Sequence, residues 1–207
     1  LEDQRFCNFE ERIWFTANSW QTPHGAGQPQ MVLGRLSKDL GEVDHLVPLR
    51  WSRMRSIEKN WLPFVDDGKL RLVYGYDPLV VLDVDTETGE CTEVCSHPSP
   101  WYAGRFRGSA GPVRCPGPDK WLLLVYEVTV LTDPQQRIYG QRLMELGRDY
   151  RPLRLSAPFY IDHRGVEFPL GFVVLDETRA IITYGREEKE SAYAIVAWRE
   201  LYARFTP

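Results

Sequence analysis

Charged and polar side chains recur at four points of this sequence, each directly before a strongly apolar run. The groups are Glu2-Asp3-Gln4-Arg5, Glu58-Lys59-Asn60-Trp61, Arg105 to Ser109, and Asp162 to Glu167. Carboxylates accept hydrogen bonds from hydroxyl groups, whereas Arg and Lys donate them and also bind phosphate. Such side chains, gathered around one pocket, suit the recognition of a sugar or a sugar phosphate.

Cleavage of a glycosidic bond usually needs one carboxyl group as acid and a second as base or nucleophile. Four carboxylates near the strand starts could supply such a pair: Asp3, Glu58, Glu127 and Glu167. Three aromatic residues are candidates for stacking on sugar rings, with core packing as the alternative for each: Trp61, Trp101 and Tyr126. The cationic group Arg50, Arg53, Arg55 and Lys59 suits an anion or a solvated face.

Each polar group precedes a copy of one strand-rich unit. The copies begin with Arg5–Asn18, Asn60–Pro78, Ser109–Val128 and Glu167–Glu187, at a spacing of about 50 to 60 residues that is typical of one propeller blade. The second strand of each unit is almost wholly apolar, which indicates a strand covered on both faces. First strands of propeller blades line a central channel, so the four polar groups are predicted to converge at its mouth.

Turns and outer strands support this fold. Short turns are predicted at Asp66-Asp67-Gly68, Gly117-Pro118-Asp119 and Asp176-Glu177-Thr178. Val80–Val84 and Tyr193–Trp198 alternate in polarity and are predicted to form a half-exposed rim. Ala197–Phe205 is the one segment expected to form a short helix. We therefore expect an all-β propeller with about four blades; a β-sandwich explains the strands but not the repeat.

Composition narrows the classes of partner. The net charge is −4, which disfavours a nucleic-acid partner, and no apolar run is long enough to span a membrane. The four cysteines, Cys7, Cys91, Cys95 and Cys115, form no disulfide framework, so a reducing, cytoplasmic location is expected. The C-x3-C-x-H spacing from Cys91 to His97 is a weak metal signal. No phosphate-binding loop occurs, and no cofactor or metal is expected.

Five segments resemble a known family. EDQR, EKNW, RGSAGPV, WLLLVYEV and TYG, in this order, are similar to motifs of the five-bladed β-propeller glycosidases and phosphorylases, nearest to glycoside hydrolase family 130 and more distantly to family 43. Related propellers also accompany glycosyltransferases. The resemblance implies one five-bladed-type propeller domain over residues 1–207, part of a longer protein that supplies the missing blade. It implies a β-mannoside-type hydrolase, phosphorylase or transferase.

The resemblance also assigns residues. Asp3 matches the proton donor of the family, and Asp3 and Glu167 are the expected catalytic residues. The expected substrate-binding residues are Glu2, Arg5, Glu58, Lys59, Asn60, Arg107, Tyr126, Glu127, His163 and Tyr184. Two departures from the family motifs argue against phosphorolysis. Gln4 replaces a proline, and Glu127 stands where the family has a phosphate-binding histidine, so its charge would repel phosphate.

Two alternatives remain open at this point. One is a noncatalytic glycan-binding or scaffold propeller, attached to a glycosyltransferase domain. The other is a protein-interaction propeller, which predicts an apolar rather than a polar top surface.

Overall fold

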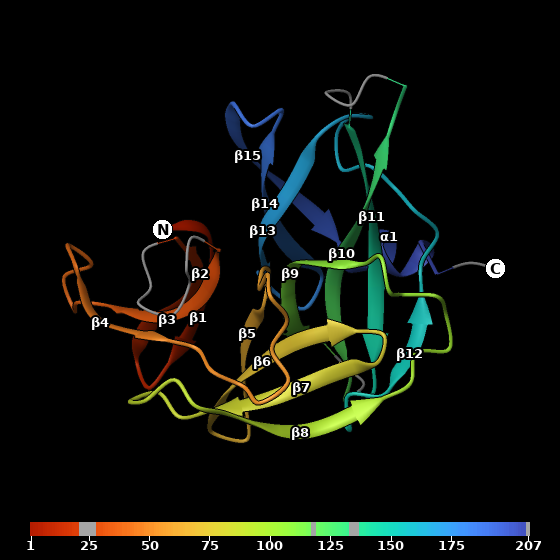
Figure 1. The fold of residues 1–207 in the computed structure, drawn as a ribbon. Helices are drawn as coiled ribbons and strands as arrows, with labels where there is room; N and C mark the ends of the chain where they lie inside the picture. The colour runs from red at the N-terminus through yellow and green to blue at the C-terminus, as the bar shows by residue number, and fades with distance from the viewer. Residues whose placement is uncertain (21–27, 117–118, 133–136, 206–207) are drawn as a thin grey trace. The chain divides into compact units, whose positions relative to one another are not determined.

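The computed structural model is an all-β protein with one short helix (Figure 1). It describes residues 1–20, 28–116, 119–132 and 137–205. Within this part, the strands form four antiparallel sheets, and in each sheet the strands are neighbours in chain order: β1-β2-β3-β4, β5-β6-β7-β8, β9-β10-β11-β12 and β13-β14-β15. These meanders are four blades of the propeller type, as the repeat predicts.

The bounds of the elements follow the predicted units closely. The first two blades consist of β1 (Glu2–Phe9), β2 (Arg12–Ser19), β3 (Gln30–Leu36), β4 (Val43–Pro48), β5 (Leu62–Asp66), β6 (Lys69–Tyr76), β7 (Leu79–Val84) and β8 (Cys91–His97). The other two consist of β9 (Arg107–Arg114), β10 (Trp121–Val130), β11 (Arg137–Leu146), β12 (Pro152–Leu155), β13 (Glu167–Val174), β14 (Arg179–Arg186) and β15 (Glu190–Ala197), followed by α1 (Trp198–Ala203). Each predicted polar group lies directly before, or at the start of, the first strand of a blade.

The chain divides into two compact units. Unit 1 comprises residues 1–75 and 79–96 and holds the first two blades. Unit 2 comprises residues 76–78 and 97–207 and holds the last two. The expectation of a single propeller domain over the whole chain remains a prediction.

In unit 1 the innermost strands β1 and β5 lie against each other. The core between the two blades is built from the apolar runs: Trp14 and Leu33 of the first blade pack with Leu72 and Leu82 of the second. Trp61, directly before β5, is fully buried in the same cluster. This packing places the start of β1 beside the start of β5.

In unit 2 the innermost strands β9 and β13 lie against each other in the same way. Leu122 and Leu143 of one blade pack with Phe172 and Ile182 of the other, and Trp198 of α1 closes this core. The short helix predicted within Ala197–Phe205 is therefore confirmed, and its burial explains why it forms at only six residues.

Two predicted turns are confirmed and one lies partly outside the described residues. Asp67-Gly68 joins β5 to β6, and 175–178 joins β13 to β14, whereas 117–118 are not described. One prediction is wrong. Leu79–Leu82 of β7 are buried at 4% exposure or less, so β7 lies inside the sheet and β8 forms the rim. The reason is that the rim of a four-stranded blade is its fourth strand. β15 does alternate in exposure, as predicted.

Within the part of the chain that the structure describes, no helix is long and apolar enough to cross a membrane.

Candidate functional site

In unit 1, a β-bulge displays Asp3 at the start of β1. The register of β1 with β2 shifts between Glu2 and Arg5, and Asp3 adopts a left-handed backbone with φ of 54°. Asp is among the few residues that tolerate this conformation. The Asp3 carboxylate is half-buried and accepts a hydrogen bond from Asn18 Nδ2 at 3.0 Å. The bulge therefore turns a carboxylate out of the regular alternation of the strand.

The buried guanidinium of Arg5 stabilises this bulge by hydrogen bonding. Arg5 is 2% exposed, and its Nη1 donates to the carbonyl oxygen of Asp3 at 2.6 Å. Its Nη2 donates to Asn60 Oδ1 at 2.9 Å, across 55 positions of sequence. Asn60 is itself buried and left-handed, with φ of 63°. The predicted residues Asp3, Arg5 and Asn60 are thus brought together, with Arg5 joining the two blade entries.

An exposed tryptophan completes this cluster. Trp20, directly after β2, is 49% exposed. Its Nε1 donates to Glu2 Oε2 at 3.2 Å, and Lys59 Nζ lies 5.5 Å from its ring centroid. Two predicted binding residues therefore flank an aromatic face of the kind that stacks on sugars. Trp20 was not among the predicted site residues; the available signal was its place at the end of a second strand that pairs with the polar start of β1.

Glu58, also predicted to bind substrate, is instead used by the fold. It is 4% exposed, and its carboxylate accepts hydrogen bonds from Trp61 Nε1 at 3.0 Å, from Tyr74 Oη at 2.9 Å and from the backbone amide of Arg55. Burial raises the pKa of Tyr74 to about 12, and the negative charge of Glu58 adds to that shift. Glu58 therefore anchors the loop before β5 and has little capacity left for a ligand.

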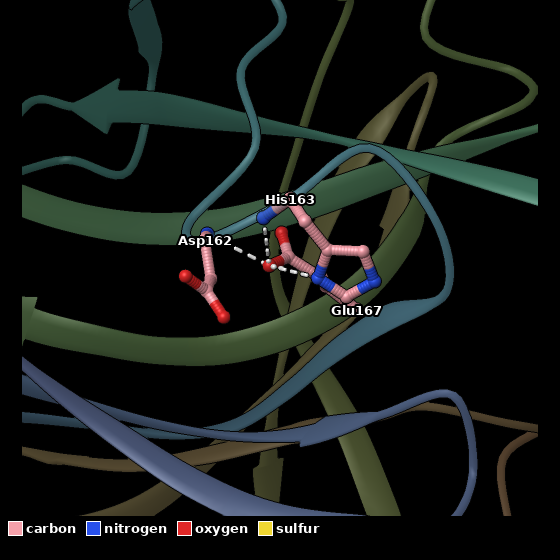
Figure 2. Close-up of side chains that lie close together, drawn as sticks. All are labelled: Asp162, His163 and Glu167. Carbon is pink, nitrogen blue, oxygen red and sulfur yellow. Dashed lines mark hydrogen bonds and ion pairs between the residues drawn. The ribbon is translucent and has the colours of Figure 1, made fainter.

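Glu167 has the same kind of role in unit 2. It is fully buried, and its carboxylate accepts three backbone amides: Ile161 at 2.7 Å, Asp162 at 2.7 Å and His163 at 2.9 Å. Figure 2 shows its oxygen facing the amides of Asp162 and His163 and the His163 ring. These contacts hold the turn before β13. Both carboxylate oxygens are therefore engaged, and neither is free for the predicted catalytic role.

His163 links that turn to the β14–β15 hairpin. Its Nε2 lies 2.9 Å from Glu187 Oε1, which also accepts the amide of Val166 at 2.9 Å. The hydrogen bond to Glu187 raises the pKa of His163 and, in return, lowers the pKa of Glu187. Gly165 makes this possible, because a Cβ there would lie 2.2 Å from Glu187 Oε1.

A cavity of about 480 Å³ lies beside this pair. Apolar side chains line part of it, including Ile138 and Val166, and the charged residues Arg137, Arg164 and Glu187 line the rest. Its volume is in the range of small-molecule sites. Two predicted residues contact its lining: His163 through Glu187 and Tyr126 through Val166.

Asp162, His163 and Glu167 offer ligand-type atoms within 4.8 Å of one another. Each of them is already engaged. The Glu167 oxygens hold the three amides, His163 Nε2 contacts Glu187, and Asp162 Oδ2 accepts Arg186 Nη1 at 2.7 Å. These hydrogen bonds explain why the three side chains lie close together. We therefore assign the three residues a structural role in shaping the turn rather than a role in metal binding.

The other predicted residues of unit 2 are Arg107, Tyr126, Glu127 and Tyr184. Tyr126 is 3% exposed and stacks on Tyr139 with ring centroids 5.1 Å apart, so it packs in the core. Glu127 is ion-paired with Arg142 at 2.9 Å. Tyr184 is buried, which raises its pKa, and Arg107 is exposed on β9. Arg107 and Tyr126 are paired residues of β9 and β10, with Glu127 next along β10, whereas Tyr184 lies on β14 of the other blade.

Two further sequence signals have structural explanations. Of the cationic group, Arg50 pairs with Glu90 and Arg53 with Glu93, which neutralises much of its charge. The four cysteines are free thiols, and burial raises the pKa of Cys91 to about 12, which makes it a poor nucleophile or metal ligand at neutral pH.

No protein-family model matches the sequence, and no curated protein is significantly similar to it. Solved structures are similar in fold. A GDP-Man-dependent mannosyltransferase from Leishmania mexicana superposes with a TM-score of 0.66 at 12% identity, covering 96% of this chain and 68% of that one. A mannose phosphorylase from the same organism gives 0.64 at 13% identity, covering 100% and 70%.

The chain has the propeller fold of these proteins. An exo-1,5-α-L-arabinanase from a bovine ruminal metagenomic library agrees, with a TM-score of 0.55 at 12% identity over 94% of this chain and 72% of that one. The resemblance that the motifs indicated is thus confirmed at the level of the fold. At these identities the likeness carries no activity with it.

Proposed function

We propose that this chain is a carbohydrate-active propeller that acts on glycosidic bonds of the mannoside type, with Asp3 as the proton donor. The observation that carries the proposal is the unit 1 cluster: a half-buried carboxylate on a bulge whose backbone Arg5 holds while also contacting Asn60, with Glu2, Trp20 and Lys59 beside it. The fold shared with mannose-handling enzymes supports the choice of sugar.

Each group has a distinct role in this proposal. Asp3 donates a proton to the leaving oxygen while water, inorganic phosphate or an acceptor hydroxyl attacks the anomeric carbon and the glycosidic C–O bond breaks. This role needs a carboxyl group displayed on a rigid frame. Arg5 is a positioning residue, because it contacts the Asp3 backbone rather than solvent. Trp20 offers its exposed ring to the apolar face of the sugar, and Glu2 and Lys59 accept and donate hydrogen bonds at the edge of that ring.

The test is turnover of β-mannosides, with and without inorganic phosphate, and of GDP-mannose with mannose acceptors, by the intact protein and by Asp3→Asn. A general acid contributes roughly 100- to 10,000-fold to rate, so Asp3→Asn should lose at least about 100-fold in kcat with sugar binding retained. Asn tolerates a left-handed backbone and keeps the contact site for Asn18.

Asp67→Asn is the matched control. Asp67 is an exposed Asp with φ of 50° in the β5–β6 turn, outside the cluster, and should leave turnover unchanged. Unchanged turnover in Asp3→Asn would reject Asp3 as the acid. Absence of turnover and of binding for every mannoside in the panel would reject the proposed function.

A second candidate is a propeller that binds glycans without turnover, as a domain beside a glycosyltransferase. It is favoured by the state of the other carboxylates: Glu58 and Glu167 hold backbone and ring N–H groups, and Glu127 is ion-paired. Binding of a mannoside that depends on Trp20, with no products from any of the substrates above, would select this function.

A further inference from the structure

One buried side chain of unit 1 contacts the proposed acid and leaves one of its own polar atoms unpaired. Asn18, in β2, is fully buried, and its Nδ2 donates to Asp3 Oδ2 at 3.0 Å. Its Oδ1 is also buried and has no hydrogen-bond partner among the described residues. A buried polar atom without a partner destabilises a folded protein and is rare, so its presence here needs an explanation.

The neighbouring carboxylate determines how the amide of Asn18 is oriented. An Asn side chain has a donor end and an acceptor end. If the amide were turned round, its Oδ1 would face Asp3 Oδ2, and two acceptors would lie against each other. The observed orientation gives Asp3 a donor and leaves the Asn18 oxygen unpaired. The contact with Asp3 is therefore kept although it lowers the stability of the fold.

The sheet holds Asn18 from both sides. β2 lies between β1 and β3, and Asn18 pairs with Glu2 of β1 and with Met31 of β3. A side chain without exposed surface in an inner strand is closely packed and has little freedom to change its rotamer. The N–H group of Asn18 is thus fixed against one particular oxygen of Asp3.

The two oxygens of Asp3 consequently differ. Oδ2 accepts the Asn18 amide, whereas Oδ1 has no partner in the part of the chain that the structure describes. In a protonated carboxyl group the carbonyl oxygen is the better acceptor, and the hydroxyl oxygen carries the proton that can be donated. The contact with Asn18 therefore favours the protonated form in which the proton lies on Oδ1.

We propose that Asn18 is a positioning residue that makes Oδ1 of Asp3 the oxygen that delivers the proton, an inference that rests on the proposed function. As the glycosidic C–O bond breaks, the proton moves from Asp3 Oδ1 to the leaving oxygen, and Asp3 becomes a carboxylate. The hydrogen bond from Asn18 then joins an ionised acceptor, and such bonds are about twice as strong as neutral ones. Because the bond strengthens in the transition state, it accelerates the reaction rather than binding the substrate.

Asn18→Leu tests this role, since leucine is close to Asn in size and has neither the donor nor the unpaired oxygen. Mannobiose and phenyl β-mannoside have leaving groups that need a proton. For both, kcat should fall at least about tenfold with KM little changed. Dinitrophenyl β-mannoside has a leaving group that departs without a proton, so its kcat should change less than about twofold.

A stability measurement separates this role from a structural one. The free energy of unfolding of Asn18→Leu, from urea denaturation, should be unchanged or higher, because the variant removes a buried atom without a partner. Added to Asp3→Asn, the same change should cause no further loss of turnover, since no proton is left to position.

Thr16→Val is the matched control. Thr16 is also fully buried in β2, two residues before Asn18, and its Oγ1 donates to the carbonyl oxygen of Trp61 at 2.8 Å. The variant removes a hydrogen bond within the fold and leaves the carbonyl unpaired. It should therefore lower the free energy of unfolding and leave kcat unchanged for all three mannosides.

The outcomes separate this inference from the proposed function. Absence of turnover of every mannoside by the parent protein would overturn the proposed catalysis and the role of Asn18 together. Turnover that Asp3→Asn loses and Asn18→Leu keeps would overturn the role of Asn18 alone. Equal losses on all three mannosides, a further loss in the double variant, or a loss of stability in Asn18→Leu equal to that in Thr16→Val would do the same.

Discussion

Two carboxylates at the starts of innermost strands serve opposite purposes. Asp3, in β1, is half-buried and accepts one side-chain amide, while its backbone is held by Arg5. Glu167, in β13, is fully buried and accepts three backbone amides. Both were predicted to be catalytic, Asp3 from its match to the proton donor of the family and Glu167 as a carboxylate near a strand start. The two carboxylates occupy equivalent positions in the repeat, but they accept different numbers of hydrogen bonds.

In this repeated fold, carboxylates at equivalent positions have either a structural role or a possible ligand-binding role. A carboxylate surrounded by backbone N–H groups stabilises a turn, because each buried N–H must find an acceptor. A carboxylate turned out by a bulge keeps oxygens available for a ligand. Glu58, with three donors, belongs with Glu167, whereas Asp3 stands apart.

The largest stability effect is expected for Glu167→Gln. This change places an amide donor against backbone donors in a buried turn, and hydrogen bonds to a charged group contribute about 1.5 to 3 kcal/mol each. We expect a loss of about 3 kcal/mol, measured by urea denaturation followed by fluorescence. Asp3→Asn sharpens the comparison and should cost under about 1 kcal/mol, since it keeps its acceptor oxygen. Equal losses in the two variants would contradict the division of roles.

A smaller effect is expected for Trp20→Ala, on binding rather than on stability. Loss of the exposed ring should weaken a bound mannoside roughly tenfold, about 1.4 kcal/mol, in isothermal titration calorimetry. The free energy of unfolding should change little, since the ring is 49% exposed. Tyr102→Ala, at a residue 76% exposed in unit 2, is the control and should bind as the parent protein does. Unaltered affinity in Trp20→Ala would remove the stacking role.

The smallest effect concerns His163 and pH. The pKa of His163 is raised in the folded state, so its ion pair with Glu187 stabilises the fold below the ordinary histidine pKa and is lost as pH rises through the raised value. The pKa of Glu187 is lowered, so the pair also weakens when pH falls through that value. Both groups are exposed, and the melting temperature should therefore move by a few degrees at most.

His163→Gln should flatten this dependence between about pH 5 and 8, measured by differential scanning fluorimetry. His97→Gln, in which the histidine contacts the carbonyl of Asp149, is the control. A pH profile unchanged by His163→Gln would show that the pair adds nothing to stability.

Much of the fold could be predicted from the sequence because its signals are local. Continuous apolar runs gave β6, β10 and β14, and the turn residues Asp67-Gly68 marked a hairpin that the structure contains. The rim was misplaced at β7 for a local reason too, since the pattern of five residues does not show how many strands follow. The sequence also predicted correctly that the polar groups lie at the starts of the first strands.

What the sequence by itself determined is the order of strands, the four repeated units and the position of each polar group in its unit. Tertiary structure alone decided which polar groups are free to act. Arg5 reaches Asn60 over 55 positions, Trp20 meets Glu2 over 18, and His163, in the turn that Glu167 holds, reaches Glu187 over 24. Burial and hydrogen-bond partners depend on segments distant in sequence, and residue type carries no record of them.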